Sequence, residues 1–251
     1  MSSLTFRLPM KLQELTVVGC IRRTGSSLDR VDLLSESNKK RCKAQLQALK
    51  SSLKTKKSED SGVSKQAAVL IPMCFVDCQP SIVFTLRSNN LRNHAGQISF
   101  PGGMVSEGDT DSVATALRES EEELGLDLGN VDVWGPMLPL PYRTGDVQIT
   151  PILANLGKID VENFELNYDE VDCVFTRDIL SLCSAKNFAQ TTYSPPPAGG
   201  YTTPIFLGGN YKIWGLTAII LHQTLNLIAP GLYTNRLVHP RTIGKATQLH
   251  N

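Results

Sequence analysis

The amino-acid sequence predicts a protein of the α/β class (α+β mixed), with a mixed β-sheet sandwiched between α-helices. Alternating apolar residues at 67–76 and 80–87 are typical of strands. An acidic helical segment ends at Gly125, and an apolar helical segment at 214–229 ends at Pro230. Hydrophobic residues make up 41% of the chain, which is enough for a packed core. Strands interleaved with two substantial helices favour layers of helix and sheet.

The first element in chain order is a basic helix at 36–57. Its apolar residues recur at three- and four-residue spacing, so one face of the helix is expected to pack on the domain: Cys42, Leu46, Leu49 and Leu53. Residues Lys54 to Gly62 are polar and typical of a linker.

The elements after the acidic helix are mostly strands, expected at 131–140, 147–155 and 171–176. Tyr193 to Gly200 is rich in proline and glycine and is expected to be a loop. A hairpin is expected around Gly208-Gly209-Asn210, between Ile205–Leu207 and Tyr211–Ile213.

Charge is distributed unevenly, because the first 66 residues are basic and the remainder is acidic. A basic head suggests targeting, a docking helix or contact with nucleic acid. The first 28 residues contain several arginines and hydroxyl residues and a single acid, Glu14, which is typical of a mitochondrial transit peptide. An unstructured basic N-terminus is the alternative. We predict a mitochondrial protein with four segments: a transit extension (1–35), a basic helix and linker (36–66), a main domain (67–237) and a tail (238–251).

The six cysteines are interpreted as reduced thiols, as expected inside cells. Cys74 and Cys78 have a spacing found in metal sites, but no second pair or histidine follows at the required distance. The alternation around them favours two buried strand residues. No stretch reaches the roughly 18 apolar residues of a membrane span.

Four carboxylates lie within five residues of the acidic helix. Residues three and four apart share a helix face, so Glu119, Glu122 and Glu123 converge while Glu121 points elsewhere. Like charges this close are unfavourable unless a cation compensates them. Hard oxygen ligands without histidine or cysteine suit Mg²⁺ or Mn²⁺. A solvated acidic face is the alternative, and the preceding Gly102-Gly103 and the abrupt stop at Gly125 count against it.

This segment resembles the box of the Nudix hydrolases, a loop-helix-loop that holds divalent cations. The matching positions are Gly103, Arg118, Glu119, Glu122, Glu123, Gly125 and Leu126. Two positions depart from the pattern. Asp109 replaces the first glutamate and is followed by one extra residue, which leaves its role open. Ser120 replaces an apolar residue and is small enough to pack.

The residues upstream resemble a second signature, found in Nudix enzymes that cleave coenzyme A. The spacing matches from Val83 through Arg87, Arg92 and Gly96 to Phe100-Pro101-Gly102-Gly103. Further segments, at 170–175 and 214–218, resemble the mitochondrial type of coenzyme A diphosphatase, so that the resemblance spans about residues 67 to 237.

The resemblance implies a Nudix fold and assigns roles to the matching residues. Glu119, Glu122 and Glu123 would hold Mg²⁺ or Mn²⁺, and Gly103 would let its backbone approach the metal. Arg118 would orient the carboxylates. Glu119 is the first choice for the general base, and Glu170 is a weaker candidate.

The resemblance also implies how substrate is bound. Arg87 and Arg92 would bind a phosphate, such as the 3′-phosphate that distinguishes coenzyme A from ADP-ribose. His94 is interpreted as a positioning or plain loop residue, and His222 as structural. Trp214 and Phe206 could stack on a base, but core packing is the favoured interpretation.

We therefore expect a metal-dependent hydrolase of a small molecule, coenzyme A or an acyl-CoA, that yields 3′,5′-ADP and 4′-phosphopantetheine or its acyl form. One alternative is a Nudix enzyme for ADP-ribose, a dinucleotide or a nucleoside triphosphate. The other is a nucleotide- or RNA-binding module whose catalysis has lapsed. The complete glutamate set argues against lapse and favours a small-molecule substrate over nucleic acid. The sequence leaves the oligomeric state open.

Overall fold

The structure, a computed structural model, describes residues 32–54, 65–91, 93–142, 146–193 and 201–238. The targeting segment expected at 1–35 lies almost wholly outside these ranges, as do Arg92 and most of the linker and the tail.

The described residues contain an eight-stranded sheet and a two-stranded one. In the large sheet β1 pairs with β7 in parallel and with β2 antiparallel, so the sheet is mixed, as predicted. Its strands are β1 (Lys65–Val76), β2 (Gln79–Arg87), β3 (Ile98–Ser99), β4 (Gly102–Met104), β5 (Asp132–Pro136), β6 (Leu140–Tyr142), β7 (Val147–Lys158) and β8 (Val171–Asp178). The small sheet pairs β9 (Phe188–Tyr193) with β10 (Tyr201–Phe206).

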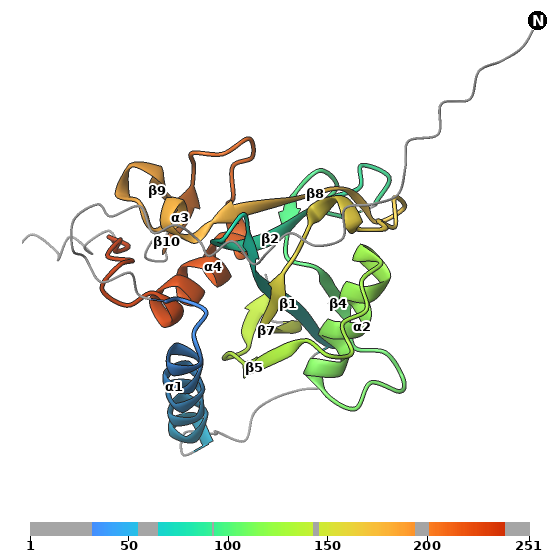
Figure 1. Cartoon of the computed structure of the whole chain (residues 1–251), viewed down its shortest axis with the longest axis horizontal. Helices are drawn as coiled ribbons and strands as arrows, with labels where there is room; N and C mark the ends of the chain where they lie inside the picture. Colours follow the sequence, from blue (N-terminus) through green and yellow to red (C-terminus); the bar gives the residue numbers. More distant parts are fainter. Residues whose placement is uncertain (1–31, 55–64, 92, 143–145, 194–200, 239–251) are drawn as a thin grey trace, which may run out of the picture. The chain divides into compact units, whose positions relative to one another are not determined.

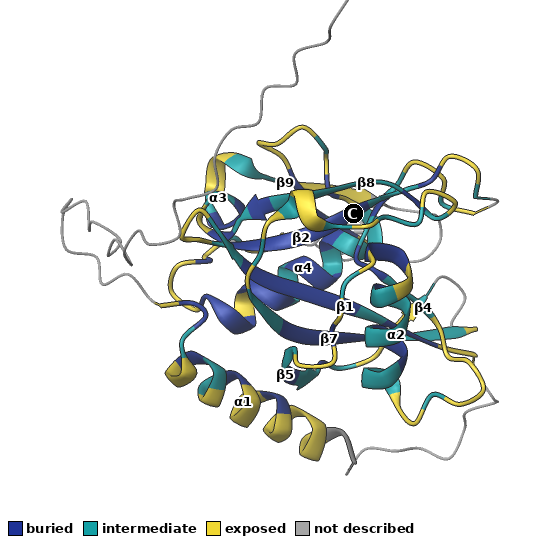
Figure 2. Cartoon of the chain, turned by 45° about the vertical axis from the view of Figure 1, so that its right-hand side comes forward, coloured by how far each residue is buried: buried dark blue, intermediate teal, exposed yellow. Residues whose placement is uncertain are grey.

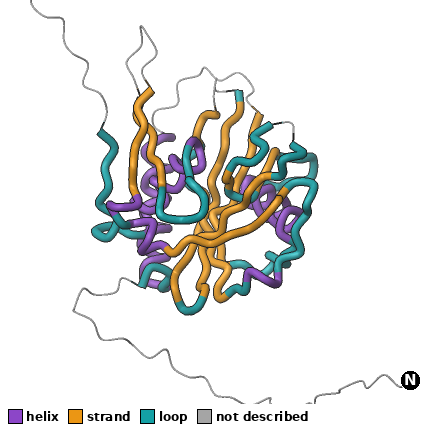
Figure 3. Tube along the Cα trace, turned by 90° about the horizontal axis from the view of Figure 1, so that it is seen from above, coloured by secondary structure: helices purple, strands orange, loops and turns teal. Residues whose placement is uncertain are grey.

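Helices cover both faces of the large sheet, which confirms the predicted sandwich (Figures 1 and 3). On one face Leu70 of β1 packs with Ala116 of α2 (Ser112–Leu124). On the other face Ile71 and Met73 share a core with α4 (Gly215–Ile228) and α1 (Glu36–Lys54). The side chains alternate along β1, so one strand serves both layers. The shorter helices are α3 (Ile179–Cys183), η1 (Val161–Asn163) and η2 (Ala185–Asn187).

Helix α1 packs on the domain through one face, and its other face is exposed (Figure 2). Cys42 and Leu46 are buried as predicted, but Leu49 is 40% exposed because the buried part of the helix ends before it. Buried Asn38 donates from Nδ2 to the carbonyls of Leu33 and Ile228, both at 2.8 Å. The bond to Ile228 satisfies a carbonyl in the last turn of α4, which has no partner within its own helix.

The prediction of one continuous strand at 131–140 is wrong. The structure divides it into β5 and β6, which pair with different parts of β7. Proline lacks an N–H for the ladder, and prolines at 136, 139 and 141 interrupt this segment.

Of the hairpin expected around Gly208, the structure contains only one isolated pair of bonded residues. Phe206 and Ile213 exchange two backbone hydrogen bonds, at 2.9 and 3.0 Å. The main partner of β10 is β9, a strand that the sequence analysis did not predict; Tyr193 therefore ends a strand rather than beginning a loop.

Cys78 is exposed, so its predicted burial in a strand is wrong. Asp77 and Cys78 have φ values of 48° and 61° and form the two-residue turn between β1 and β2. Two left-handed residues in succession match the twist of a tight hairpin. Cys42, Cys74, Cys173 and Cys183 are free thiols. In the described part of the chain, no helix is long and apolar enough to cross a membrane.

Replacing Asn38 with alanine should lower the free energy of unfolding by about 1–3 kcal/mol, because a buried carbonyl of α4 would lose its partner. For a protein of this size the melting temperature should fall by roughly 2–10 °C. Exposed Lys43, on the outer face of the same helix, provides the control, and Lys43→Ala should change little. Equal melting temperatures for the two variants would contradict the capping role of Asn38.

Candidate active site

Two glycines bring the loop before α2 against the sheet and the helix. Strand β4 pairs with β1 so that Gly102 lies opposite Val69 and Gly103 opposite Ala68. A Cβ atom on Gly102 would lie 2.3 Å from the carbonyl oxygen of Ala68, and one on Gly103 would lie 2.3 Å from Glu119 Oε2. Gly102 therefore requires glycine for close backbone packing, and a side chain at Gly103 would displace the Glu119 carboxylate.

Helix α2 has a defined beginning and end. The carboxylate of Asp111 accepts hydrogen bonds from the N–H groups of Val113 and Ala114, both at 2.9 Å. Gly125 follows the last helical residue with a left-handed φ of 63°, as predicted, and a Cβ there would lie 2.3 Å from the carbonyl oxygen of Glu165. These two ends fix the position of the glutamates along the helix.

Arg118 is held by Asp109 and in turn holds two glutamates. Its Nε and Nη2 donate to the two carboxylate oxygens of Asp109 at 2.9 and 3.0 Å. It also pairs with Glu119 at 3.0 Å and with Glu122 at 3.2 Å, which is the orienting role expected for it.

The sequence left the role of Asp109 open, because this residue departs from the box pattern. The structure shows its partners. Its side chain is 6% exposed and also accepts hydrogen bonds from the Ser106 N–H and the Thr115 hydroxyl. The Arg118 guanidinium, followed by the Ser106 N–H, holds the pKa of Asp109 well below its usual range.

Glu123 is buried at the end of α2, and its charge is poorly compensated. Glu123 is only 3% exposed. Burial raises the pKa of Glu123 to about 8, with further contributions from Glu170 and Glu119, while Arg87 and the backbone of Gly102 oppose the shift. An ionised Glu123 is therefore unfavourable without a further positive charge.

Glu119 shares this environment. Burial raises the pKa of Glu119, the hydrogen bond from Arg118 lowers it, and the charges of Glu122 and Glu170 raise it further. The carboxylates of Glu119, Glu122, Glu123 and Glu170 therefore act on one another electrostatically. Glu121 points elsewhere, as predicted, because its Oε1 accepts a hydrogen bond from the Leu128 N–H at 2.9 Å.

The donor set fits a hard divalent cation. All the groups are carboxylate oxygens, and a bound cation would favour the ionised forms that burial and mutual repulsion now oppose. In the part of the chain that the structure describes, no three Asp, Glu, His or Cys side chains already surround a common point.

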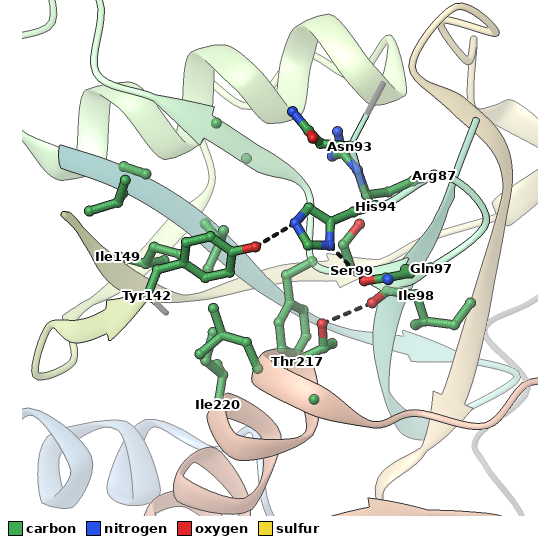
Figure 4. A pocket seen from close by; sticks show the side chains of 18 of the residues that line it. Arg87, Asn93, His94, Gln97, Ile98, Ser99, Tyr142, Ile149, Thr217 and Ile220 are labelled. Atoms are coloured by element: carbon green, nitrogen blue, oxygen red, sulfur yellow. Dashed lines mark hydrogen bonds between the residues drawn. The ribbon is translucent and has the colours of Figure 1, made fainter. Parts of the chain in front are cut away.

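A pocket of about 620 Å³ has Arg87 and Gly103 in its lining (Figure 4 labels Arg87). Residues from strands β1, β2, β4, β6 and β7, from the segment at 93–100 that includes β3, and from the start of α4 line it. Arg87 lines this pocket and also lies close enough to Glu123 to lower its pKa. Arg87 Nε is buried and has no hydrogen-bond partner among the described residues. Arg87 therefore joins the pocket to the buried carboxylate.

The structure places His94 in this pocket and adds two residues that the sequence analysis missed. His94, with a left-handed φ of 59°, accepts or donates at both ring nitrogens: Nδ1 bonds to Gln97 Oε1 at 2.9 Å and Nε2 to the hydroxyl of Tyr142. Gln97 and Tyr142 carried no sequence signal.

Trp214 lines the pocket and is 48% exposed, so its expected place in the core is wrong, whereas Phe206 is fully buried as expected. His222 bonds to the Tyr233 hydroxyl at 2.6 Å, as a structural residue would.

A carboxylate-bearing helix between a Gly-Gly loop and a glycine stop, set on a mixed sheet, defines a Nudix-type hydrolase. The NUDIX domain family matches residues 65–177, and the chain belongs to the Nudix hydrolases. Enzymes of this family generally need divalent metal ions.

Two relatives match over most of their length. The chain is 39% identical to "Mitochondrial coenzyme A diphosphatase NUDT8" of Mus musculus over 83% of this chain and 96% of the relative. It is 38% identical to the Homo sapiens protein of the same name over 82% and 84%. A solved MutT/nudix family protein from Enterococcus faecalis superposes with a TM-score of 0.45 and 15% identity, covering 76% of this chain and 74% of that one.

Replacing Asp109 with asparagine should lower activity by about 10- to 100-fold, the usual effect of removing a group that orients a metal-binding residue. The amide would present an N–H₂ group to Arg118, which would then no longer be held toward Glu119. Exposed Glu107 precedes Asp109 by two residues, and Glu107→Gln is the matched control. Full activity in Asp109→Asn would show that Arg118 does not need this partner.

Proposed function

We propose that this chain is a metal-dependent coenzyme A diphosphatase. It hydrolyses the diphosphate bond of coenzyme A and acyl-CoA thioesters, giving 3′,5′-ADP and 4′-phosphopantetheine or its acyl form. One observation carries the proposal: Arg87, from the signature of coenzyme A-cleaving enzymes, lines a pocket beside buried Glu123 of the Nudix helix. The printed names of the two mammalian relatives support the same substrate.

Glu119, Glu122, Glu123 and the backbone of Gly103 would hold the cation, which we propose is Mg²⁺ or Mn²⁺. When bound, the ion neutralises the diphosphate oxygens and makes water a better nucleophile. Arg118 keeps Glu119 and Glu122 in place through its ion pairs at 3.0 and 3.2 Å.

The remaining roles fall to groups around the carboxylates. Glu119 accepts the proton of the attacking water at its carboxylate, with Glu170 as the second choice. We assign Arg87 to the diphosphate, because its guanidinium lies close enough to Glu123 to lower the pKa of that carboxyl, and Glu123 would hold the cation at the reacting bond. This replaces the 3′-phosphate as the group expected to contact Arg87; Arg92 keeps its expected role in substrate binding.

Neither alternative function has a specific observation in its favour. A lapsed binding module would not need the intact set of carboxylates with Arg118 and Asp109 arranged around it. ADP-ribose carries a hydroxyl-rich ribose on its diphosphate and a dinucleotide carries a second nucleoside, whereas the pocket beside Arg87 has apolar side chains such as Ile149 and Ile220 in its described lining.

The test is hydrolysis of a substrate panel by the purified full chain with Mg²⁺ or Mn²⁺. Coenzyme A and acyl-CoA should give 3′,5′-ADP and phosphopantetheine products, identified by mass spectrometry, and a chelator should abolish the reaction. Faster cleavage of ADP-ribose or a nucleoside triphosphate than of any coenzyme A species would overturn the proposal.

Glu123→Gln should reduce turnover of coenzyme A by about 10²- to 10³-fold, the usual cost of losing a key catalytic interaction. The substitution keeps the size of the buried side chain and removes its charge. Glu121→Gln is the matched control on the same helix, since glutamine can still accept the Leu128 N–H hydrogen bond. If both variants retain the parent's turnover, the assignment of the metal-binding carboxylates is wrong.

Arg87→Ala should lower kcat/KM for coenzyme A by roughly ten- to a hundredfold, the contribution of a charge-assisted hydrogen bond. If Arg87 binds the diphosphate, dephospho-coenzyme A should lose activity by the same factor. A loss confined to coenzyme A would instead assign Arg87 to the 3′-phosphate.

We also propose that the protein is mitochondrial and that residues 1–35 direct it there, with 67–237 as the hydrolase domain and 36–66 and 238–251 as its extensions. The acid-poor composition of the first segment and the names of the relatives support this proposal. A fluorescent protein fused to residues 1–35 should be imported by mitochondria. Diffuse fluorescence throughout the cell would contradict the targeting role.

A further inference from the structure

The lining of the pocket is polar and charged on one side and apolar on the other. In Figure 4, Arg87 and Asn93 lie on one side, Ile149 and Ile220 lie on the other, and the His94–Tyr142 hydrogen bond lies between them. Among the described residues that line the pocket, Arg87 alone carries a full charge, and it lies at the end beside Glu123. The pocket therefore leads from the reacting carboxylates into a neutral region.

The middle of the pocket offers hydrogen bonds without charge. Both ring nitrogens of His94 are hydrogen-bonded, to Gln97 and Tyr142, so the imidazole is fixed in the wall of the pocket. The amide of Asn93 lies nearby on the same loop. Neutral amides and hydroxyls suit a ligand that contains amide groups, because such a ligand donates and accepts hydrogen bonds without bringing a charge.

The apolar part of the lining is incompletely covered. Val69, Ile149 and Leu216 are only half-buried, and Met104 and Trp214, which also line the pocket, are 44% and 48% exposed. Large apolar side chains left open around one cavity favour an apolar ligand, because a ligand that covers them removes their surface from water.

Coenzyme A has two unlike arms on its diphosphate. One arm is adenosine with a 3′-phosphate, which needs cationic partners. The other is pantetheine, an uncharged chain with amide groups that ends in a thiol or an acyl thioester. We propose that this pocket holds the pantetheine arm, with its amides beside Asn93, Gln97 and Tyr142 and its sulfur and acyl group against Ile149 and Ile220. The inference rests on the proposed function and names the half of the substrate that the pocket recognises.

Ile149 is then a specificity-determining residue. It lies in β7, where its backbone pairs with Ala67 and Leu140, and its half-buried side chain lines the pocket. Phenylalanine is well tolerated in strands, so Ile149→Phe should fold while filling the end of the pocket. The larger ring would compete with the acyl group for the same space, and the usual cost of overpacking corresponds to about tenfold in affinity.

The test measures binding without catalysis. Octanoyl-pantetheine contains the proposed arm and lacks the diphosphate, and its affinity for the full chain can be measured by calorimetry beside that of 3′,5′-ADP. Ile149→Phe should weaken octanoyl-pantetheine binding by about tenfold and leave 3′,5′-ADP binding unchanged. Leu180→Phe, the same kind of enlargement at a 47% exposed position in α3 outside the pocket, should change neither.

Hydrolysis of coenzyme A by the parent is measured in parallel, so the two proposals can fail separately. If the parent cleaves coenzyme A but does not bind octanoyl-pantetheine, or if Ile149→Phe binds it as the parent does, the inference is overturned and the proposed function stands. If octanoyl-pantetheine binds and Ile149→Phe weakens it as expected, the inference is supported. If the parent cleaves no coenzyme A species, the proposed function fails and the inference fails with it. Circular dichroism shows whether Ile149→Phe is folded. If it is unfolded, binding of octanoyl-pantetheine by the parent decides between the outcomes.

Discussion

Glu119 and Glu123 lie one helical turn apart and are both withdrawn from water, an arrangement that costs free energy unless a cation joins them. Much of the surrounding structure serves to maintain it. Gly103 leaves room for the Glu119 carboxylate, and Gly102 lets the loop lie on β1. Asp109 holds Arg118, and Arg118 holds Glu119. The Asp111 cap and the Gly125 stop set where along the sheet the helix presents these groups.

Local signals in the sequence predicted most of this helix and little of what surrounds it. The glycine stop and the face shared by Glu119 and Glu123 follow from helix geometry, which depends only on neighbours in the chain. The burial of Glu123 depends on strands that arrive from elsewhere, so periodicity could not indicate it. The role of Asp109 was hidden because an extra residue shifts it from the usual spacing, although its carboxylate still reaches Arg118.

The sheet shows the same division. The long strands β1, β2 and β7 have clear apolar patterns, and the sequence predicted them. The short strands β3 and β4 exist because neighbouring strands offer them hydrogen bonds. Trp214 and Leu49 look like core residues by type, yet one opens onto the pocket and the other onto solvent. The contact between His94 and Tyr142 joins residues 48 positions apart, which no local pattern reveals.

The central claim, that the buried carboxylates form a cation site, can be tested by thermal unfolding of the parent and of Glu123→Gln with and without Mn²⁺, in the absence of substrate. Without metal the variant should be at least as stable as the parent, because it buries a neutral side chain. Metal at about a hundred times its dissociation constant should raise the parent's melting temperature by roughly 5–10 °C and the variant's by much less. An equal rise in both proteins, or none in the parent, would show that Glu123 does not bind the cation.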